Sequence, residues 1–403
     1  VLTPSAKVSH MIARSIKEKE ADVKIVFGGV HPSVLTAVTL EDSAVDFVIS
    51  GEGEIAMKEL IDALEGKRDL RSVDGLSFRE DGKVHHNPIR EFINNLDELG
   101  KPDWTPFPPI SQYKPLPHWH LKQPSLPMLT SRGCPFRCTF CCVNVSGGTY
   151  RARSAKFVVD EIEEAVNRFG VKQISFFDPA FPMNKKIAKD ICEEIIKREL
   201  HRKIVWMTES RIDCVDKELL SLMKESGCRR LAFGIESGNQ KILDSIRKKI
   251  TLEQVRETIK NVKEAGIEII AYFIIGFPED TINTVNETIE FAKELDTDYV
   301  KFNIAVPYPG TEMYDYAVKT GRLRTRDWDI YTSFSSMTNY DPVFTPENID
   351  VETLKKMQRK AFRSYYFRPR MILKHIKKLR SPYIFGEYIN SAFTMLKSLR
   401  GEV

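Results

Sequence analysis

Four of the seven cysteines of this 403-residue chain lie within nine positions, inside the stretch Ser131-Arg-Gly-Cys-Pro-Phe-Arg-Cys-Thr-Phe-Cys-Cys142. The stretch begins at the last residue of a predicted β-strand, residues 126–131. The thiols of Cys134, Cys138 and Cys141 are spaced four and three residues apart. Because thiols at this spacing can converge on one metal centre, the sequence predicts a metal-binding loop at the carboxyl end of a strand.

The cysteine pattern fits an iron–sulfur cluster better than zinc. A closed zinc site usually needs four ligands, commonly as two pairs, but the remaining cysteines, Cys192, Cys214 and Cys228, are isolated. Three thiolates suit a [4Fe–4S] cluster whose fourth iron stays open to a substrate or cofactor. We interpret Cys192 and Cys228 as core residues and Cys142 as a packed neighbour. A structural zinc-binding interaction protein is the alternative from another class, and metal analysis distinguishes the two.

The region around and after this loop has the regular pattern of an α/β fold. Candidate strands are each followed by a segment of helical periodicity, and Thr251 to Gln254 form a capping box. Six successive strand–helix units predict a parallel sheet that curls into a partial (β/α)6 TIM-like barrel, with its chemistry at the carboxyl ends of the strands. The candidate strands are residues 126–131, 172–177, 203–207, 230–235, 268–275 and 298–304.

With Phe140 before the third cysteine, the motif Cys134-x3-Cys138-x2-Cys141 on the loop after the first strand resembles that of the radical S-adenosylmethionine (SAM) superfamily. The resemblance implies that the three cysteines ligate a [4Fe–4S] cluster. It also implies that the amino and carboxylate groups of SAM chelate the open iron, and that reductive cleavage yields a 5′-deoxyadenosyl radical. No residue of this chain is assigned to catalysis itself.

The same resemblance implies a SAM site at successive strand ends. Strand four ends in Gly-Ile-Glu-Ser-Gly, strand five carries Ile-Ile-Gly-Phe-Pro-Glu, and Arg211 after strand three would pair with the SAM carboxylate. After strand two, Phe-Asp-Pro-Ala-Phe replaces the family's frequent Gly-Gly-Glu, which makes Asp178 the candidate for the SAM amino group. The expected SAM contacts are Phe140, Asp178, Thr208, Arg211, Glu236, Ser237, Ile274, Gly276 and Glu279.

The N-terminal region indicates one branch of the superfamily. Two β-branched runs, residues 22–27 and 45–49, end in glycines, and a helical pattern runs on to Leu64. These segments resemble the second half of a Rossmann-like cobalamin (B12)-binding domain, which implies cobalamin contacts at Gly28, Gly29 and His31. Because the chain starts at Val1 rather than Met, we expect the first strands of that domain to lie upstream. We also expect cobalamin binding to depend on those strands.

We expect four regions along the chain. Residues 1–65 form the C-terminal half of the cobalamin-binding-like domain, and residues 66–124 a hairpin with a proline-rich linker. Residues 125–321 form the radical SAM barrel, and residues 322–403 a basic, mainly helical cap. From Lys355 onward, thirteen Lys and Arg residues face two acidic ones. We prefer to interpret this tail as a helix with a solvated basic face over a core stripe, which comprises Met357, Ala361, Phe362 and Ile372.

The resemblance implies a cytoplasmic enzyme that uses a [4Fe–4S] cluster, SAM and cobalamin to methylate an unactivated carbon. A radical SAM oxidative cyclase or rearranging enzyme is the alternative, and the lack of a second cysteine cluster disfavours a methylthiotransferase. The implied partners are a small-molecule or lipid-like substrate and a reductant such as flavodoxin or ferredoxin. The basic tail leaves peripheral membrane contact open, whereas specific nucleic-acid binding lacks any recognised module. The longest apolar run, residues 269–277, is too short to span a membrane.

Overall fold

The computed structural model describes residues 1–115, 117–142, 145 and 147–378, and these residues divide into two compact units. The N-terminal unit comprises Val1–Asn94, Gly133–Thr149 and Val306–Thr332. The barrel unit comprises Asn95–Arg132, Tyr150–Ala305 and the chain from Ser333 onward. Within the described residues, no helix is both long and apolar enough to cross a membrane.

The N-terminal unit is built on a four-stranded sheet in the order β1-β2-β3-β4. β1 and β2 are parallel, as their alternation with helices implies, whereas β3 and β4 form the predicted antiparallel hairpin. The hairpin extends the N-terminal sheet beside β2, so it does not group with the linker of residues 66–124. The strands are Val26–Gly28 (β1), Phe47–Ile49 (β2), Leu76–Glu80 (β3) and Lys83–His86 (β4).

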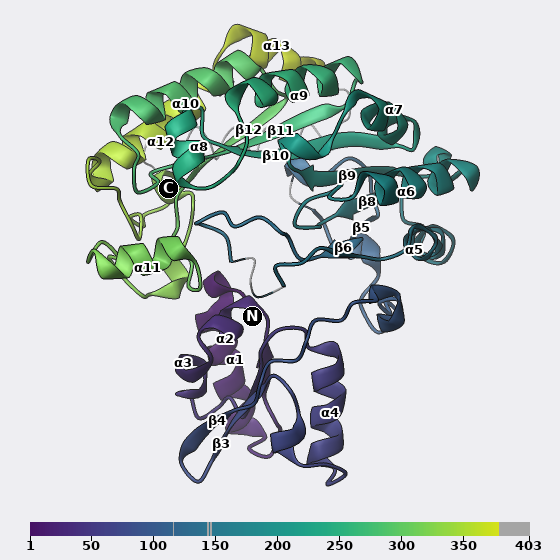
Figure 1. The fold of residues 1–403 in the computed structure, drawn as a ribbon, viewed down its shortest axis with the longest axis vertical. Helices are drawn as coiled ribbons and strands as arrows, with labels where there is room; N and C mark the ends of the chain where they lie inside the picture. Colours follow the sequence, from purple (N-terminus) through teal and green to yellow (C-terminus); the bar gives the residue numbers. More distant parts are fainter. Residues whose placement is uncertain (116, 143–144, 146, 379–403) are drawn as a thin grey trace. The chain divides into compact units, whose positions relative to one another are not determined.

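Helices cover both faces of this sheet (Figure 1). On one face, Ala56 and Leu60 of α4 pack with Phe47 and Phe78; on the other, Ala13 of α1 packs with the remaining sheet residues. Two-sided burial explains why β2 reads as a continuous apolar run rather than an alternating one. The helices are Ala6–Lys19 (α1), Val30–Val34 (α2), Thr36–Leu40 (α3) and Glu54–Leu64 (α4).

A segment after the last barrel strand returns to the N-terminal unit. It contains α11 (Glu312–Lys319), whose Met313 amide donates to the Thr139 carbonyl at 3.0 Å. Lys7 forms an ion pair with Asp329 at 2.8 Å. The segment Val306–Thr332 therefore groups with the N-terminal unit, although the sequence analysis divided it between the barrel and the cap.

The barrel unit contains six parallel strands whose spatial order follows the sequence, β12-β11-β10-β9-β8-β5. This confirms the predicted six-unit parallel sheet, with boundaries shifted by a few residues. A short antiparallel pair, β6 (Ser131–Arg132) with β7 (Arg151–Ala152), brackets the cysteine loop. The six strands are Ser125–Met128 (β5), Gln173–Phe176 (β8), Val205–Ser210 (β9), Cys228–Glu236 (β10), Glu268–Ile275 (β11) and Tyr299–Ile304 (β12).

Helices between the strands cover the outer face of the curved sheet (Figure 1). Polar N-caps begin them: the Ser154 hydroxyl accepts from the Phe157 amide, and Thr251 forms the predicted capping box with Gln254. Gly170 ends α5 in the left-handed conformation. The helices are Ala155–Phe169 (α5), Lys185–Lys197 (α6), Lys217–Glu225 (α7), Gln240–Ser245 (α8), Leu252–Glu264 (α9) and Ile282–Leu295 (α10).

Helix α12 (Val351–Tyr366) covers the edge strand β12. Its Tyr366 hydroxyl donates to the Val300 carbonyl at 2.7 Å and Gln358 donates to the Phe302 carbonyl at 2.7 Å, which satisfies polar groups that an edge strand exposes. Met357, Ala361 and Phe362 are buried, as predicted.

The prediction for Ile372 is wrong, because Ile372 is 44% exposed and its neighbour Met371 is fully buried. A new helix, α13 (Pro369–Lys378), begins at Pro369, so the periodicity of α12 does not continue across the break. Most of the remaining basic tail, residues 379–403, lies outside the described residues.

Candidate cofactor site

The cysteine loop belongs to the N-terminal unit, and its cysteines form no disulfide. Cys134 is buried, Cys138 is half-buried and Cys141 is exposed. The Cys141 amide donates to the Cys138 carbonyl at 3.1 Å, which forms a tight turn between the last two cysteines of the motif. Three unbridged thiols within eight residues are a donor set that suits an iron–sulfur cluster.

No three His, Cys, Asp or Glu side chains of the described chain are gathered closely enough to hold a metal ion. Cluster ligation by Cys134, Cys138 and Cys141 therefore stays a prediction from their spacing. Three other cysteines were predicted to be packing residues. Cys192 and Cys228 are fully buried, and half-buried Cys142 lies against Gly310.

The entry to the cysteine loop requires glycine at position 133. Gly133 has φ +79°, and a Cβ there would lie 2.1 Å from the Thr149 carbonyl oxygen. A side chain would therefore clash with backbone that cannot move without displacing the end of the same loop. The sequence analysis did not single out this glycine.

Asp178 lies behind the segment that leads into the cysteine loop. It is 1% exposed, and its carboxylate accepts from the Thr130 amide at 2.7 Å, the Thr130 hydroxyl, the Ser131 amide at 3.3 Å and the Ser131 hydroxyl at 2.9 Å. Burial raises the pKa of Asp178, whereas these hydrogen bonds favour the charged form and lower it. The effect of burial is larger, so the pKa is about 6. In this structure Asp178 thus anchors the end of β5; its predicted contact with the SAM amino group is untested.

Arg211 follows β9 and is buried. Its guanidinium binds the Asp213 carboxylate through Nε at 2.9 Å and Nη2 at 3.1 Å, and Nη2 also donates to the Lys248 carbonyl at 2.9 Å. The fork geometry expected for a SAM carboxylate is therefore present, and Asp213 supplies the carboxylate in this structure.

Glu236 lies at the carboxyl end of β10 in the left-handed conformation, with φ +71°. Its carboxylate accepts from the Lys248 ammonium at 2.6 Å, and the side chains of both residues are less than one-tenth exposed. Non-glycine residues in this conformation are uncommon and concentrate at functional sites. Lys248 was missed in the sequence because nothing local marks it; only the tertiary structure brings it to Glu236.

The other expected SAM contacts lie at neighbouring strand ends. Thr208 and Ser237 are buried, Ile274 is half-buried and Glu279 is exposed, with its carboxylate 3.2 Å from the Ser245 hydroxyl. The Ser237 hydroxyl lies 3.1 Å from that of Thr288. Phe140 is half-buried in the cysteine loop of the N-terminal unit.

The turn after β11 is held by a residue that the sequence analysis missed. Asp280 is 2% exposed and accepts from the Gly276 amide at 2.8 Å, the Phe277 amide at 2.9 Å and the Thr284 hydroxyl at 2.6 Å. Burial raises the pKa of Asp280 to about 6. An Asp that directly follows a Gly-Phe-Pro-Glu turn and precedes a helix is a signal that could have found it.

The predicted cobalamin contacts lie in the N-terminal unit after β1. Gly29 has φ +98°, which favours glycine, and the Gly28 carbonyl accepts from the Val1 amino group. His31 is 3% exposed: its Nδ1 lies 3.2 Å from the Thr3 hydroxyl, and its ring packs edge-on against Trp328. Burial lowers the pKa of His31 to about 4, so the imidazole is neutral and committed to packing.

Two family models match the chain. The radical SAM superfamily model matches residues 128–292, and the B12-binding domain model matches residues 1–61. The first match contains the cysteine loop and strands β8 to β11, and the second contains β1, β2 and most of α4.

Relatives extend these matches over almost the whole chain. An uncharacterized methyltransferase of Pyrococcus horikoshii is 38% identical over 91% of this chain and 78% of its own length. An anaerobic magnesium-protoporphyrin IX monomethyl ester cyclase of Rubrivivax gelatinosus is 29% identical over 91% of this chain, which spans just under two thirds (66%) of the cyclase.

A solved structure shows the same fold. The cobalamin-dependent SAM radical enzyme OxsB with bound aqua-cobalamin aligns with a TM-score of 0.74 and 19% identity, over 98% of this chain and 62% of OxsB. The predicted fold class and the resemblance to a known superfamily are confirmed by these comparisons. The chain belongs to the radical SAM superfamily, in the branch that carries a B12-binding domain.

Proposed function

We propose that this chain is a cobalamin-associated radical SAM enzyme that cleaves SAM reductively and methylates an unactivated carbon. The observation that carries the proposal is the 38% identity, over 91% of the chain, to a relative named as a methyltransferase. When bound, the cluster, SAM and cobalamin supply one-electron cleavage of SAM and methyl transfer, and the protein supplies binding, orientation and electrostatics.

We propose that Cys134, Cys138 and Cys141 hold the cluster. Asp178 positions the chain that enters their loop, since it binds both residues that precede Arg132. The glycine at 133 lets the two ends of the loop approach each other. Together these contacts would hold the three thiolates in a defined arrangement once iron binds.

We propose that the strand ends of the barrel unit hold SAM. Arg211 presents a planar fork that suits a carboxylate, and the SAM carboxylate would join or replace Asp213 there. Glu236 would accept from a hydroxyl or amino group while its carboxylate also accepts from Lys248 in a buried position. Gly276, whose amide Asp280 orients, keeps the backbone open for close approach of the adenine.

We propose that cobalamin binds the N-terminal unit at Gly28 and Gly29, where the chain turns from β1 into α2. His31 serves this site as a packed loop residue rather than as a cobalt ligand, because its Nδ1 and its ring already contact Thr3 and Trp328. Its pKa, lowered by burial, is consistent with a neutral structural role.

Radical cyclisation is the second candidate function. The 29% identity to the Rubrivivax cyclase over 91% of the chain favours it, and the site residues above serve both reactions. For either reaction we propose a small-molecule substrate, a flavodoxin- or ferredoxin-type reductant and a cytoplasmic location. Membrane contact through the basic tail is not part of the proposal.

Anaerobic reconstitution with iron and sulfide tests the proposal. We expect about four irons per chain, release of 5′-deoxyadenosine from SAM, and loss of both in Cys138→Ala but not in Cys192→Ala, which removes a thiol outside the loop. Incubation with cobalamin and methyl-labelled SAM should then place label in a carbon-bound methyl group of the product. Deoxyadenosine release without label transfer would favour the cyclase; about one zinc and no iron would refute both candidates.

A further inference from the structure

A cavity of about 530 Å³ lies inside the barrel unit. It is lined by side chains that point inward from the strands, by residues of the proline-rich linker and by two residues after β12. The register places Glu209 of β9, Tyr272 of β11 and Lys301 of β12 on the same face of the sheet. Cavities of this size hold small organic ligands in proteins.

The linker is held firmly where it forms one wall of the cavity. Gln173 is fully buried and donates to the Trp119 carbonyl at 2.7 Å, while Arg230 donates to the His118 carbonyl at 2.5 Å. The Trp119 ring packs with Met207 and the other apolar residues of the barrel interior. The wall is therefore preformed by buried contacts rather than left to a mobile loop.

The cavity presents flat aromatic surface. Trp119 and Phe177 stack with their ring centres 4.6 Å apart and their planes 25° from parallel, and Tyr272, Tyr113 and Phe334 complete the aromatic lining. Aromatic faces of this kind favour a planar, conjugated ligand, which gains both apolar burial and stacking.

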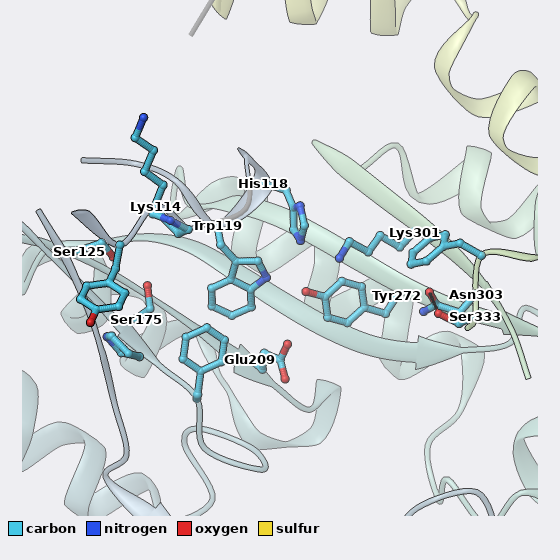
Figure 2. A pocket seen from close by; sticks show the side chains of 15 residues that line it. Lys114, His118, Trp119, Ser125, Ser175, Glu209, Tyr272, Lys301, Asn303 and Ser333 are labelled. Atoms are coloured by element: carbon cyan, nitrogen blue, oxygen red, sulfur yellow. Dashed lines mark hydrogen bonds between the residues drawn. The ribbon is translucent and has the colours of Figure 1, made fainter. Parts of the chain in front are cut away.

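Two nitrogen atoms in the cavity lack partners within the described part of the chain. His118 Nε2 is buried without a hydrogen bond, and the Lys301 ammonium has neither a hydrogen bond nor an ion pair; it lies 5.4 Å from the centre of the Tyr272 ring. Figure 2 shows both side chains converging on the Tyr272 hydroxyl end of the cavity. A buried nitrogen without a partner, such as His118 Nε2, is costly, and Lys301 beside it is half-buried, so this end of the cavity can receive a polar group of a ligand.

The nearby acid does not satisfy these groups. The Glu209 side chain hydrogen-bonds to Tyr272, and its charge raises the pKa of Lys301 without forming an ion pair among the described residues. Burial outweighs this effect and lowers the pKa of Lys301 to about 8, and burial lowers that of His118 to about 3, so near neutral pH Lys301 is mainly charged and His118 is neutral. An ammonium and a neutral imidazole can both donate hydrogen bonds, so this end of the cavity suits an acceptor group such as a carboxylate.

The cavity also borders the proposed SAM site. Gly234 of β10 lies on the same inward face, and a Cβ built there would be 2.5 Å from Glu236 Oε1 and 3.0 Å from Lys248 Nζ. The Glu236–Lys248 pair therefore occupies the space that a side chain at position 234 would take. The Glu236 charge also acts on Glu209, which lines the cavity. A ligand in the cavity would lie next to the strand end at which SAM is proposed to bind.

We propose that this cavity binds the substrate of the chain, and that the substrate is a planar, conjugated carboxylate whose acid group binds Lys301 and His118. The inference rests on the proposed function, since it identifies the substrate class of that site. The flat body lies against Trp119 and Tyr272, and the carboxylate accepts a hydrogen bond from the Lys301 ammonium, which makes none with the described residues.

An isosteric pair of probes tests the proposal on the full chain with its cluster reconstituted. Dissociation constants for 2-naphthoate and its neutral amide, 2-naphthamide, are measured by ligand-observed NMR without reductant. We expect the naphthoate to bind about tenfold more tightly than the amide, as a charge-assisted hydrogen bond predicts. Lys301→Met should remove this preference and Lys301→Arg should keep it.

Lys114 is the matched control. It lines the rim of the same cavity, but its ammonium points away from the other lining side chains (Figure 2). Lys114→Met, which removes the same charge, should leave the preference for naphthoate intact. Equal binding of the two probes by the wild type, an unchanged preference in Lys301→Met, or competitive displacement of naphthoate by SAM would overturn the proposal.

This experiment separates the inference from the proposed function. Probe binding requires no SAM cleavage, so a chain that releases 5′-deoxyadenosine but does not discriminate between the probes overturns only the substrate class. A chain that discriminates between them but never cleaves SAM overturns only the proposed function.

Discussion

Replacement of Lys248 by Met tests whether the buried pair with Glu236 holds the end of β10. The two charged atoms are 2.6 Å apart, and the side chains are 7% and 8% exposed. At an effective dielectric constant of about 20 their attraction is roughly 6 kcal/mol, but desolvation offsets much of it. Loss of one partner leaves the other charge buried without a counter-charge. We therefore expect the free energy of unfolding to fall by about 3–5 kcal/mol.

Urea denaturation followed by far-ultraviolet circular dichroism measures this loss. With a slope of about 3 kcal/mol per molar urea, the midpoint should fall by about 1 M or more. Lys189→Met is the matched control, because Lys189 pairs with Glu218 at 2.6 Å while Glu218 is 80% exposed; it should cost less than about 1 kcal/mol.

The double variant Lys248→Met with Glu236→Gln sharpens the test. It removes both charges, so it should recover a large part of the stability that Lys248→Met alone loses. The reasoning is refuted if Lys248→Met shifts the midpoint no more than Lys189→Met, or if the double variant is less stable by the sum of its single changes.

Three further predictions follow from the site. Gly133→Ala should lower the free energy of unfolding by several kcal/mol and reduce iron incorporation. The control is Gly66→Ala, because Gly66 has φ +77° but open space around it; this change should lower the free energy of unfolding by only about 1–2 kcal/mol. Equal melting temperatures of the two variants would contradict the clash argument. Asp178→Asn should lower the free energy of unfolding, measured by urea denaturation, by about 1–3 kcal/mol, because an amide nitrogen cannot accept hydrogen bonds from the surrounding donors. The control is Asp103→Asn at an exposed carboxylate, which should lower the free energy of unfolding by less than half as much. Naphthoate affinity should fall as pH rises from 7 to 9.5, since Lys301 loses its proton with a pKa of about 8; a flat profile, parallel to that of naphthamide, would exclude Lys301 as the anion partner.

The predictions from the sequence succeeded where the signal is local. β11 and α4 have their predicted boundaries or ends, because β-branched runs and helical periodicity are properties of consecutive residues. The capping box at Thr251 was predicted correctly for the same reason. The spacing of three cysteines and its resemblance to a known motif were sufficient to predict the superfamily that the comparisons confirm.

The failures and omissions share one physical cause, which is that the partners lie far apart in the sequence. Ile372 was assigned to the core because one periodicity was extended across Pro369, whereas packing against the barrel buries Met371 instead. The hairpin of residues 76–86 joined the N-terminal sheet because β2 had an unpaired edge, which no local pattern of the hairpin reveals.

By itself the sequence determined the strand–helix order, the caps and the thiol spacing, because each depends on residues within about one turn or one strand of each other. Only the tertiary structure decided which charges are paired. It brought Lys248 to Glu236, and among the described residues it left the Lys301 ammonium and His118 Nε2 without a hydrogen bond in a cavity that Trp119 lines. Burial sets the cost of an unpaired charge, and burial depends on contacts between segments that the chain's local pattern does not specify.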